Sequence, residues 1–257
     1  YIEQGEADTT IDTRAYFWYG LTLMNQGLYD SASQQLRYYL TTIDSNEVFY
    51  GEKARLSLES CDFADLLLEN PLKIRIDTSI SDEVNTPQSD FAPHVHDGLL
   101  YYSSMDFEPE NPDPKVAWNI SKILTYDSKE GKSLLSTKVN HLDLLTQHAC
   151  LSNDGSRMYF TICNYVTGAE IQCDIYTSKK DKSGEWSERL KLPDNINASG
   201  STSTHPAIMK NPYDGKHYLL FVSDRKGGKG RLDIWMSEIL GDNLYGTPKN
   251  LEDINTF

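Results

Sequence analysis

One pattern occurs three times in this chain: FAPHVHDGLLYYSS (residues 91–104), HACLSNDGSRMYFT (residues 148–161) and HPAIMKNPYDGKHYLLFVS (residues 205–223). Each copy contains an apolar run, an Asp-Gly pair and a second apolar run. The Asp-Gly pairs recur after 57 and then 60 residues. Because glycine accepts the positive φ that tight hairpins need, each copy predicts two antiparallel strands joined by a turn.

Further strands are predicted after each copy. Third strands are expected at residues 122–125, 174–177 and 233–237, and fourth strands at residues 186–192 and, more weakly, near Tyr245. The segments between copies also resemble one another, at residues 83–86, 195–198 and 253–256. Four strands per unit at this period are typical of β-propeller blades. The sequence therefore predicts about three four-stranded antiparallel blades over residues 71–257.

Residues 10–70 follow a helical period instead. Apolar residues recur at three- and four-residue spacing from Tyr16 through Tyr19 and Leu23, and again over residues 32–40. A third helix is expected over residues 47–69, since the proline that follows cannot continue it. The expected fold class is α+β and multidomain, with helical hairpins in residues 1–70 and a partial propeller after them. Three blades are fewer than the four to eight that close known rings, so we expect a truncated propeller.

Composition excludes several kinds of partner. The formal charge of −14 would repel nucleic acid, and no basic stripe offsets it. No apolar stretch approaches the ~20 residues of a membrane-spanning helix, so no transmembrane segment is expected. The chain begins with Tyr1 and shows no signal peptide, so we expect processing to have set its start.

The four cysteines show no metal-binding spacing. Cys163 and Cys173 flank residues 165–170, where a hairpin centred on Gly168 would place them opposite each other. A cross-strand disulfide and two buried, packed thiols both remain open.

Catalytic motifs are missing from the sequence: it has no G-x-S-x-G elbow, no H-E-x-x-H pair and no P-loop. The candidate carboxylates of a propeller hydrolase are, by position alone, Asp90, Asp97, Asp154 and Asp214. The last three belong to the repeated Asp-Gly turns, whose geometry already explains them. We therefore expect no enzyme and no catalytic residues. A propeller hydrolase acting on glycans or peptides is the alternative.

Two histidines occupy equivalent positions in the repeat. His148 and His205 begin successive copies, where a propeller would line its channel. A metal shared between blades is one interpretation, and packing at the channel wall is the other. We expect no metal and no cofactor. A propeller that senses a small ligand or metal remains a further alternative.

The helical segment resembles a tetratricopeptide repeat. The matching positions are Tyr16, Tyr19, Gly20, Leu23, Ala32 and Leu36, although Asp44 stands where that family places its terminal proline. A generic αα-hairpin is the alternative. The resemblance implies a groove for a protein partner, and Tyr16, Trp18 and Tyr38 are the aromatic residues predicted to contact it.

The repeated sheets resemble the PD40, TolB-type WD40-like propeller repeat, through the pattern A-P…D-G…(L/M)-Y-(F/Y)-(S/T)…D-I-(Y/W). The first copy departs from it with Lys122-Ile123-Leu124. With the helical segment, the arrangement is similar to OmpA-family envelope proteins, and in particular to PorE-like components of the type IX secretion system. This resemblance implies a non-enzymatic periplasmic scaffold associated with the outer membrane. Its partners would be secretion components, and an absent C-terminal domain would bind peptidoglycan.

Overall fold

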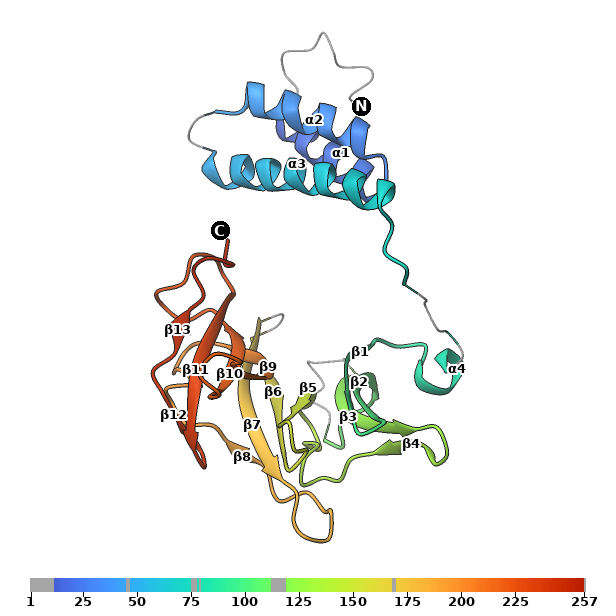
Figure 1. Ribbon diagram of the computed structural model, residues 1–257, viewed down its shortest axis with the longest axis vertical. Coiled ribbons are helices and arrows are strands. Elements are labelled where there is room, and N and C mark those ends of the chain that lie inside the picture. The colour runs from blue at the N-terminus through green and yellow to red at the C-terminus, as the bar shows by residue number, and fades with distance from the viewer. Residues whose placement is uncertain are drawn as a thin grey trace. The chain divides into compact units, whose positions relative to one another are not determined.

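The computed structural model describes residues 12–44, 47–74, 78, 80–111, 119–167 and 170–256. Contacts between Cα atoms divide the chain into two compact units, one comprising Tyr1–Ile76 and Phe257 and the other Asp77–Thr256. The first unit is helical and the second is built from antiparallel sheets (Figure 1). None of the described helices is long and apolar enough to cross a bilayer.

The helical unit contains α1 (Arg14–Asn25), α2 (Tyr29–Thr42) and α3 (Val48–Glu69). Gly27 takes a left-handed φ of 74° directly after α1, and the N–H of Leu28 bonds back to the Leu23 carbonyl at 3.0 Å. This is the glycine-based stop that commonly ends a helix. The third helix ends at Glu69, two residues before Pro71, as its sequence predicts.

The core of the helical unit includes two of the expected positions of α1, Gly20 and Leu23, but Phe17 takes the place expected of Tyr19. Phe17, Gly20 and Leu23 are the buried residues of α1, whereas Tyr19 is exposed. A Cβ on Gly20 would come within 2.8 Å of the Leu36 side chain, so glycine lets α1 and α2 approach closely. The helices are present as predicted, while their assignment to the tetratricopeptide family stays a prediction.

The second unit is mostly β, with three antiparallel sheets in chain order and one short helix, α4 (Ser81–Val84), before them. The first sheet consists of β1 (Asp90–His96), β2 (Leu99–Phe107), β3 (Ile120–Asp127) and β4 (Gly131–Leu134). The second consists of β5 (Leu145–Leu151), β6 (Arg157–Thr167), β7 (Glu170–Lys179) and β8 (Leu190–Lys191). The third consists of β9 (Ser203–Lys210), β10 (His217–Ser223), β11 (Asp233–Gly241), β12 (Leu244–Tyr245) and β13 (Lys249–Asn250).

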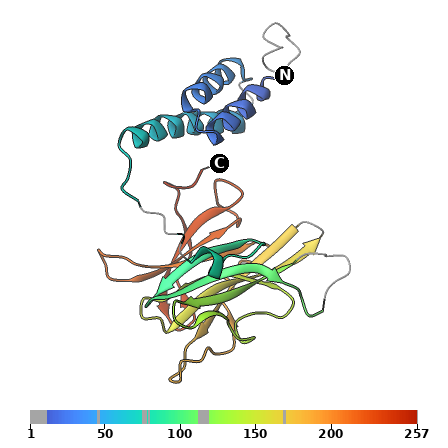
Figure 2. The same cartoon turned by 90° about the vertical axis from the view of Figure 1, so that its right-hand side faces the viewer.

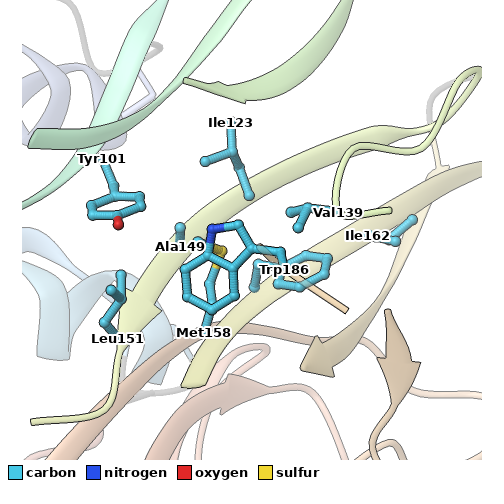
Figure 3. Packing of buried hydrophobic residues seen from close by; sticks show 9 residues of the cluster. Tyr101, Ile123, Val139, Ala149, Leu151, Met158, Ile162 and Trp186 are labelled. Carbon is cyan, nitrogen blue, oxygen red and sulfur yellow. The ribbon is translucent and has the colours of Figure 1, made fainter. Parts of the chain in front are cut away.

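Successive sheets pack face to face, and their cores fill the two interfaces. Tyr101 and Ile123 of the first sheet meet Met158 and Phe160 of the second in one buried cluster, whose packing Figure 3 shows. A second cluster joins the second sheet to the third and includes Ile175, Leu219 and Phe221. Figure 2 shows the first sheet, in green, lying across the second, in yellow. The hydrophobic effect thus stabilises the stack at both interfaces.

An asparagine in the segment after each sheet binds that sheet's third strand. Asn140, Asn197 and Asn255 each accept a hydrogen bond from a β-strand N–H at 2.8 Å, donated by Ile123, Ile175 and Ile234 respectively. Each also donates its amide N–H to the carbonyl of the same isoleucine, at 3.0, 2.9 and 2.9 Å. This pairing satisfies backbone groups where a strand neighbour is absent. It accounts for the asparagine in two of the three similar segments, residues 195–198 and 253–256, whereas Asn140 lies outside the segments that the sequence comparison selected.

The fourth strands are shorter than the sequence predicts. Of the expected strand 186–192, Leu190 and Lys191 form β8, while Trp186 makes an isolated bridge to Lys180 and its side chain joins the first interface cluster. The four-strand period itself is present in the first two sheets.

Candidate functional site

The innermost strand of each sheet carries the same backbone distortion. Ala92, His148 and His205 have positive φ values of 53°, 56° and 49°. Each lies where the pairing register of the inner strand shifts, as a β-bulge does. A left-handed φ is unfavourable by about 1–2 kcal/mol of conformational free energy for a residue other than glycine. Because it occurs at three equivalent positions, we infer that the fold requires this backbone conformation there.

The bulges bring side chains of all three sheets together. The imidazole rings of His148 and His205 stack with centroids 3.6 Å apart, and the ring of Phe91 meets His148 edge-on at 5.5 Å. The Thr204 hydroxyl lies 3.1 Å from Nδ1 of His205 and 3.4 Å from Nδ1 of His148. We call these four residues the inner-strand cluster. The sequence predicts the equivalence of the two histidines but not their stacking.

Both stacked histidines are neutral at pH 7. Burial, and to a smaller degree the proximity of His205, lowers the pKa of His148 to about 3. Burial also lowers the pKa of His205. Among the described residues, no group of three or more His, Cys, Asp and Glu side chains is arranged to hold a metal ion. The cluster therefore offers neutral imidazoles that can each donate and accept one hydrogen bond.

A cleft of 740 Å³ opens between the second and third sheets. Its lining comes from the β5–β6 turn, the starts of β6 and β10, and the ends of β7, β9 and β11. Apolar contacts come from Ile208, Ile239 and Leu240, and polar groups from residues such as Ser152 and Asn153. This volume lies in the range of small-molecule sites, and the mixed lining suits a ligand that is polar at its edges and apolar on its faces.

Three charged residues meet at one wall of the cleft. The Asp242 carboxylate accepts hydrogen bonds from both the Arg157 guanidinium and the Lys179 ammonium group. The bonds from Lys179 and Arg157 hold the pKa of Asp242 below its usual value. A second carboxylate, Asp154, lines the same cleft, and its bonds to Ser152 and Ser156 lower its pKa to about 2. With two cations and two carboxylates, the charged groups of the cleft balance at pH 7.

Of the three aromatic residues predicted to contact a partner, two are exposed at the surface of the helical unit. Trp18 and Tyr38 are both about half exposed. Tyr16 packs on Tyr38 with ring centroids 4.5 Å apart, whereas Trp18 meets Phe17 and Tyr50 edge-on. Their contact with a partner stays a prediction.

The structure bonds Cys163 to Cys173 as a disulfide. The two residues are directly opposite each other on β6 and β7, with Cα atoms 4.0 Å apart. Cys61 and Cys150 are free and buried. Gly168, on which the predicted hairpin is centred, lies outside the described residues.

The four candidate carboxylates do not share one site, although Asp97 and Asp154 line the same cavity of 430 Å³. Asp97, Asp154 and Asp214 lie in the turns that join the first two strands of each sheet, whereas Asp90 begins β1. Asp90 and Asp97 are thus at opposite ends of one strand, roughly 20 Å apart at the usual rise per residue. The missed charged residues are Arg157, Lys179 and Asp242. Nothing in their local sequence marks them, because Arg157 and Asp242 are 85 positions apart.

The glycine-rich loop at residues 227–230 binds a carboxylate from the same chain. The backbone N–H groups of Lys229 and Gly230 donate to the buried Asp233 carboxylate at 2.7 and 3.3 Å. These donors are therefore occupied and not available to a phosphate group.

No protein-family model matches the chain, and no curated protein matches it. Solved structures with partial similarity include an α-L-arabinofuranosidase from Lactobacillus brevis, with TM-score 0.40 and 13% identity over 63% of this chain and 54% of that one. A family 43 glycoside hydrolase from a capybara gut metagenome gives 0.36 and 14%, over 66% and 32%. A puromycin-hydrolysing peptidase of Mycobacterium tuberculosis gives 0.34 and 14%, over 70% and 34%. The matches thus span about a third to a half of those proteins, and similarity of this size assigns no activity.

These comparisons correct the expectation of a PD40/TolB-type, PorE-like protein. Five of the similar structures are named as hydrolases, mainly of glycoside hydrolase family 43, and these five names include no secretion component. The non-enzymatic scaffold and type IX secretion assignments are therefore wrong. The physical reason is that the repeat period specifies strands and turns, which unrelated functions share, while function depends on the residues of one site.

Proposed function

We propose that Asp77–Thr256 is a β-propeller-like unit that acts on glycans and binds a sugar chain in the cleft between its second and third sheets. The observation that carries the proposal is the cleft itself: 740 Å³, lined by charge-balanced polar groups together with the apolar side chains of Ile208, Ile239 and Leu240. Sugar rings present hydroxyl groups at their edges and C–H groups on their faces. Paired charged side chains supply the directional donors and acceptors that such a ligand needs.

Hydrolysis of the bound glycan would need one protonated carboxylic acid beside one carboxylate. Asp154 and Asp242 line the cleft, but hydrogen bonds lower both of their pKa values, so both are ionised at pH 7. In this state the cleft supports glycan binding more directly than acid catalysis. A bound sugar could displace the hydrogen-bond donors of either carboxylate. The pKa of that carboxyl group would then rise, which would favour the protonated form that general acid catalysis needs.

The disulfide supports a location for the protein. Structural disulfides persist in oxidising compartments and are rare in the cytosol. Cys163 and Cys173 are bonded across β6 and β7. We therefore place the protein outside the reducing cytosol.

Calorimetric titration of the full chain with a panel of oligosaccharides, α-L-arabinofuranosyl chains included, tests the proposal. Asn153→Ala removes an exposed polar group from the cleft lining and should weaken binding about fivefold, the cost of one hydrogen bond. Lys182→Ala, on an exposed loop away from the described cleft lining, is the control and should bind as the parent does. No binding across the panel would refute the proposal. Release of reducing sugar that stops in Asp154→Asn would extend it to hydrolysis.

A further inference from the structure

Arg157 and Lys179 form an unusual pair within the second sheet. They are directly opposite each other on the neighbouring strands β6 and β7. Like charges at directly opposed positions destabilise a sheet. The pair therefore favours an anion between its two cationic groups.

In this structure the anion is Asp242, which the third sheet supplies from the β11–β12 turn. The side chain of Arg157 is only 15% exposed, whereas that of Asp242 is 64% exposed. Arg157 is thus enclosed in the sheet, whereas the Lys179 side chain is half exposed and the carboxylate that neutralises both lies at the surface. A ligand can replace Asp242 without disturbing the strands.

The same three residues also line a second cavity, of 260 Å³, beside the cleft. Asn243, next to Asp242, lies in this second cavity with a positive φ of 56°. Its side-chain Oδ1 is buried, and no described residue donates a hydrogen bond to it. A donor from a ligand that entered beside Asp242 would satisfy that oxygen.

We propose that the glycan bound in the cleft carries a carboxylate, as a uronic acid does, and that this carboxylate takes the place of Asp242 on Arg157 and Lys179. The inference rests on the proposed function, since it names the class of sugar for the same cleft. The planar guanidinium of Arg157 can bind a carboxylate through two parallel hydrogen bonds, and the ammonium group of Lys179 adds a second positive charge. Ser152 and Asn153 lie on the same lining and can bond the hydroxyl groups of the sugar.

Calorimetry with the full chain tests the inference, using trigalacturonate and the matched neutral trigalactoside as probes. Asp242→Asn removes the competing charge and keeps the size of the side chain, so affinity for trigalacturonate should rise at least tenfold relative to affinity for the neutral sugar measured in the same variant. Arg157→Gln should lower affinity for trigalacturonate at least tenfold. Thermal melting of each variant checks that it is folded before titration.

The outcomes separate this inference from the proposed function. Equal affinity for the two sugars, unchanged by Asp242→Asn, would overturn the acidic-sugar inference and leave glycan binding intact. If neither these two sugars nor the earlier panel binds, both proposals fail. If acetate and citrate bind as tightly as trigalacturonate and depend equally on Arg157, the site takes an adventitious ion only, and the inference is overturned.

Discussion

The side-chain amide of Asn197 is bonded to both backbone groups of Ile175, accepting from its N–H at 2.8 Å and donating to its carbonyl at 2.9 Å. It also donates to the Leu192 carbonyl at 3.0 Å, and Asn197 is almost fully buried. The same arrangement recurs at Asn140 and Asn255. One side chain in each repeat thus fixes the path of the chain from one sheet to the next.

Asn197→Ala should reduce the free energy of unfolding by about 3 kcal/mol, because it removes three hydrogen bonds and leaves buried backbone groups unpaired. Urea unfolding followed by tryptophan fluorescence measures the loss. Asn140→Ala, at the equivalent position, should behave alike, and the exposed Asn153→Ala should change stability by less than about 0.5 kcal/mol. A similar small effect at Asn197 would show that its hydrogen bonds do not stabilise the fold.

His148 should make the protein less stable as the pH falls from about 6.5 to about 3. Burial lowers its pKa in the folded state to about 3. The unfolded state therefore binds the proton at a higher pH, and this binding stabilises it relative to the folded state. The free energy of unfolding has its full value above the unfolded pKa of about 6.5. It decreases as the pH falls from there to about 3, by as much as several kcal/mol. His148→Gln should flatten the pH dependence of the urea midpoint. Parallel curves for parent and variant would contradict a neutral, buried His148.

Thiol titration should find two reactive cysteines per denatured, unreduced chain and four after reduction. The first two are Cys61 and Cys150, which are free and buried. In the native protein neither should react readily, and burial raises the pKa of Cys150 to about 12, so almost no thiolate forms there. Four reactive thiols without reduction would rule out the bond between Cys163 and Cys173.

Replacing both Cys163 and Cys173 with serine should lower stability by about 2–3 kcal/mol, the chain-entropy value for a loop of this length. The two residues are 10 positions apart. Thermal melts of the parent, with and without reductant, should show the same shift as the double variant. A double variant as stable as the oxidised parent would show that strand pairing alone fixes this hairpin.

Phe17→Ala should destabilise the helical unit by about 3–5 kcal/mol, since Phe17 is fully buried among α1, α2 and α3. Trp18→Ala should cost much less, because Trp18 is half exposed and meets Phe17 and Tyr50 edge-on. Helical circular dichroism during heating distinguishes the two. Equal losses would mean that Trp18 belongs to the core.

Much of the local structure is predictable from the sequence. The third helix occupies Val48–Glu69 against an expectation of residues 47–69, because proline and the helical period act over a few residues. The choice of buried face on α1 is harder to predict. Phe17 and Tyr19 are both aromatic and two positions apart, and only the placement of α2 and α3 decides which is enclosed.

What the sequence alone determined is the repeat: the Asp-Gly hairpins, the strand order within each sheet and the equivalence of His148 with His205. These follow from turn chemistry and alternation, which depend on neighbours along the chain. Only the tertiary structure decided that Asp242 would neutralise Arg157 and Lys179, and that two imidazoles would stack. Such contacts join residues 85 and 57 positions apart, and they depend on how separate sheets pack and where their bulges point.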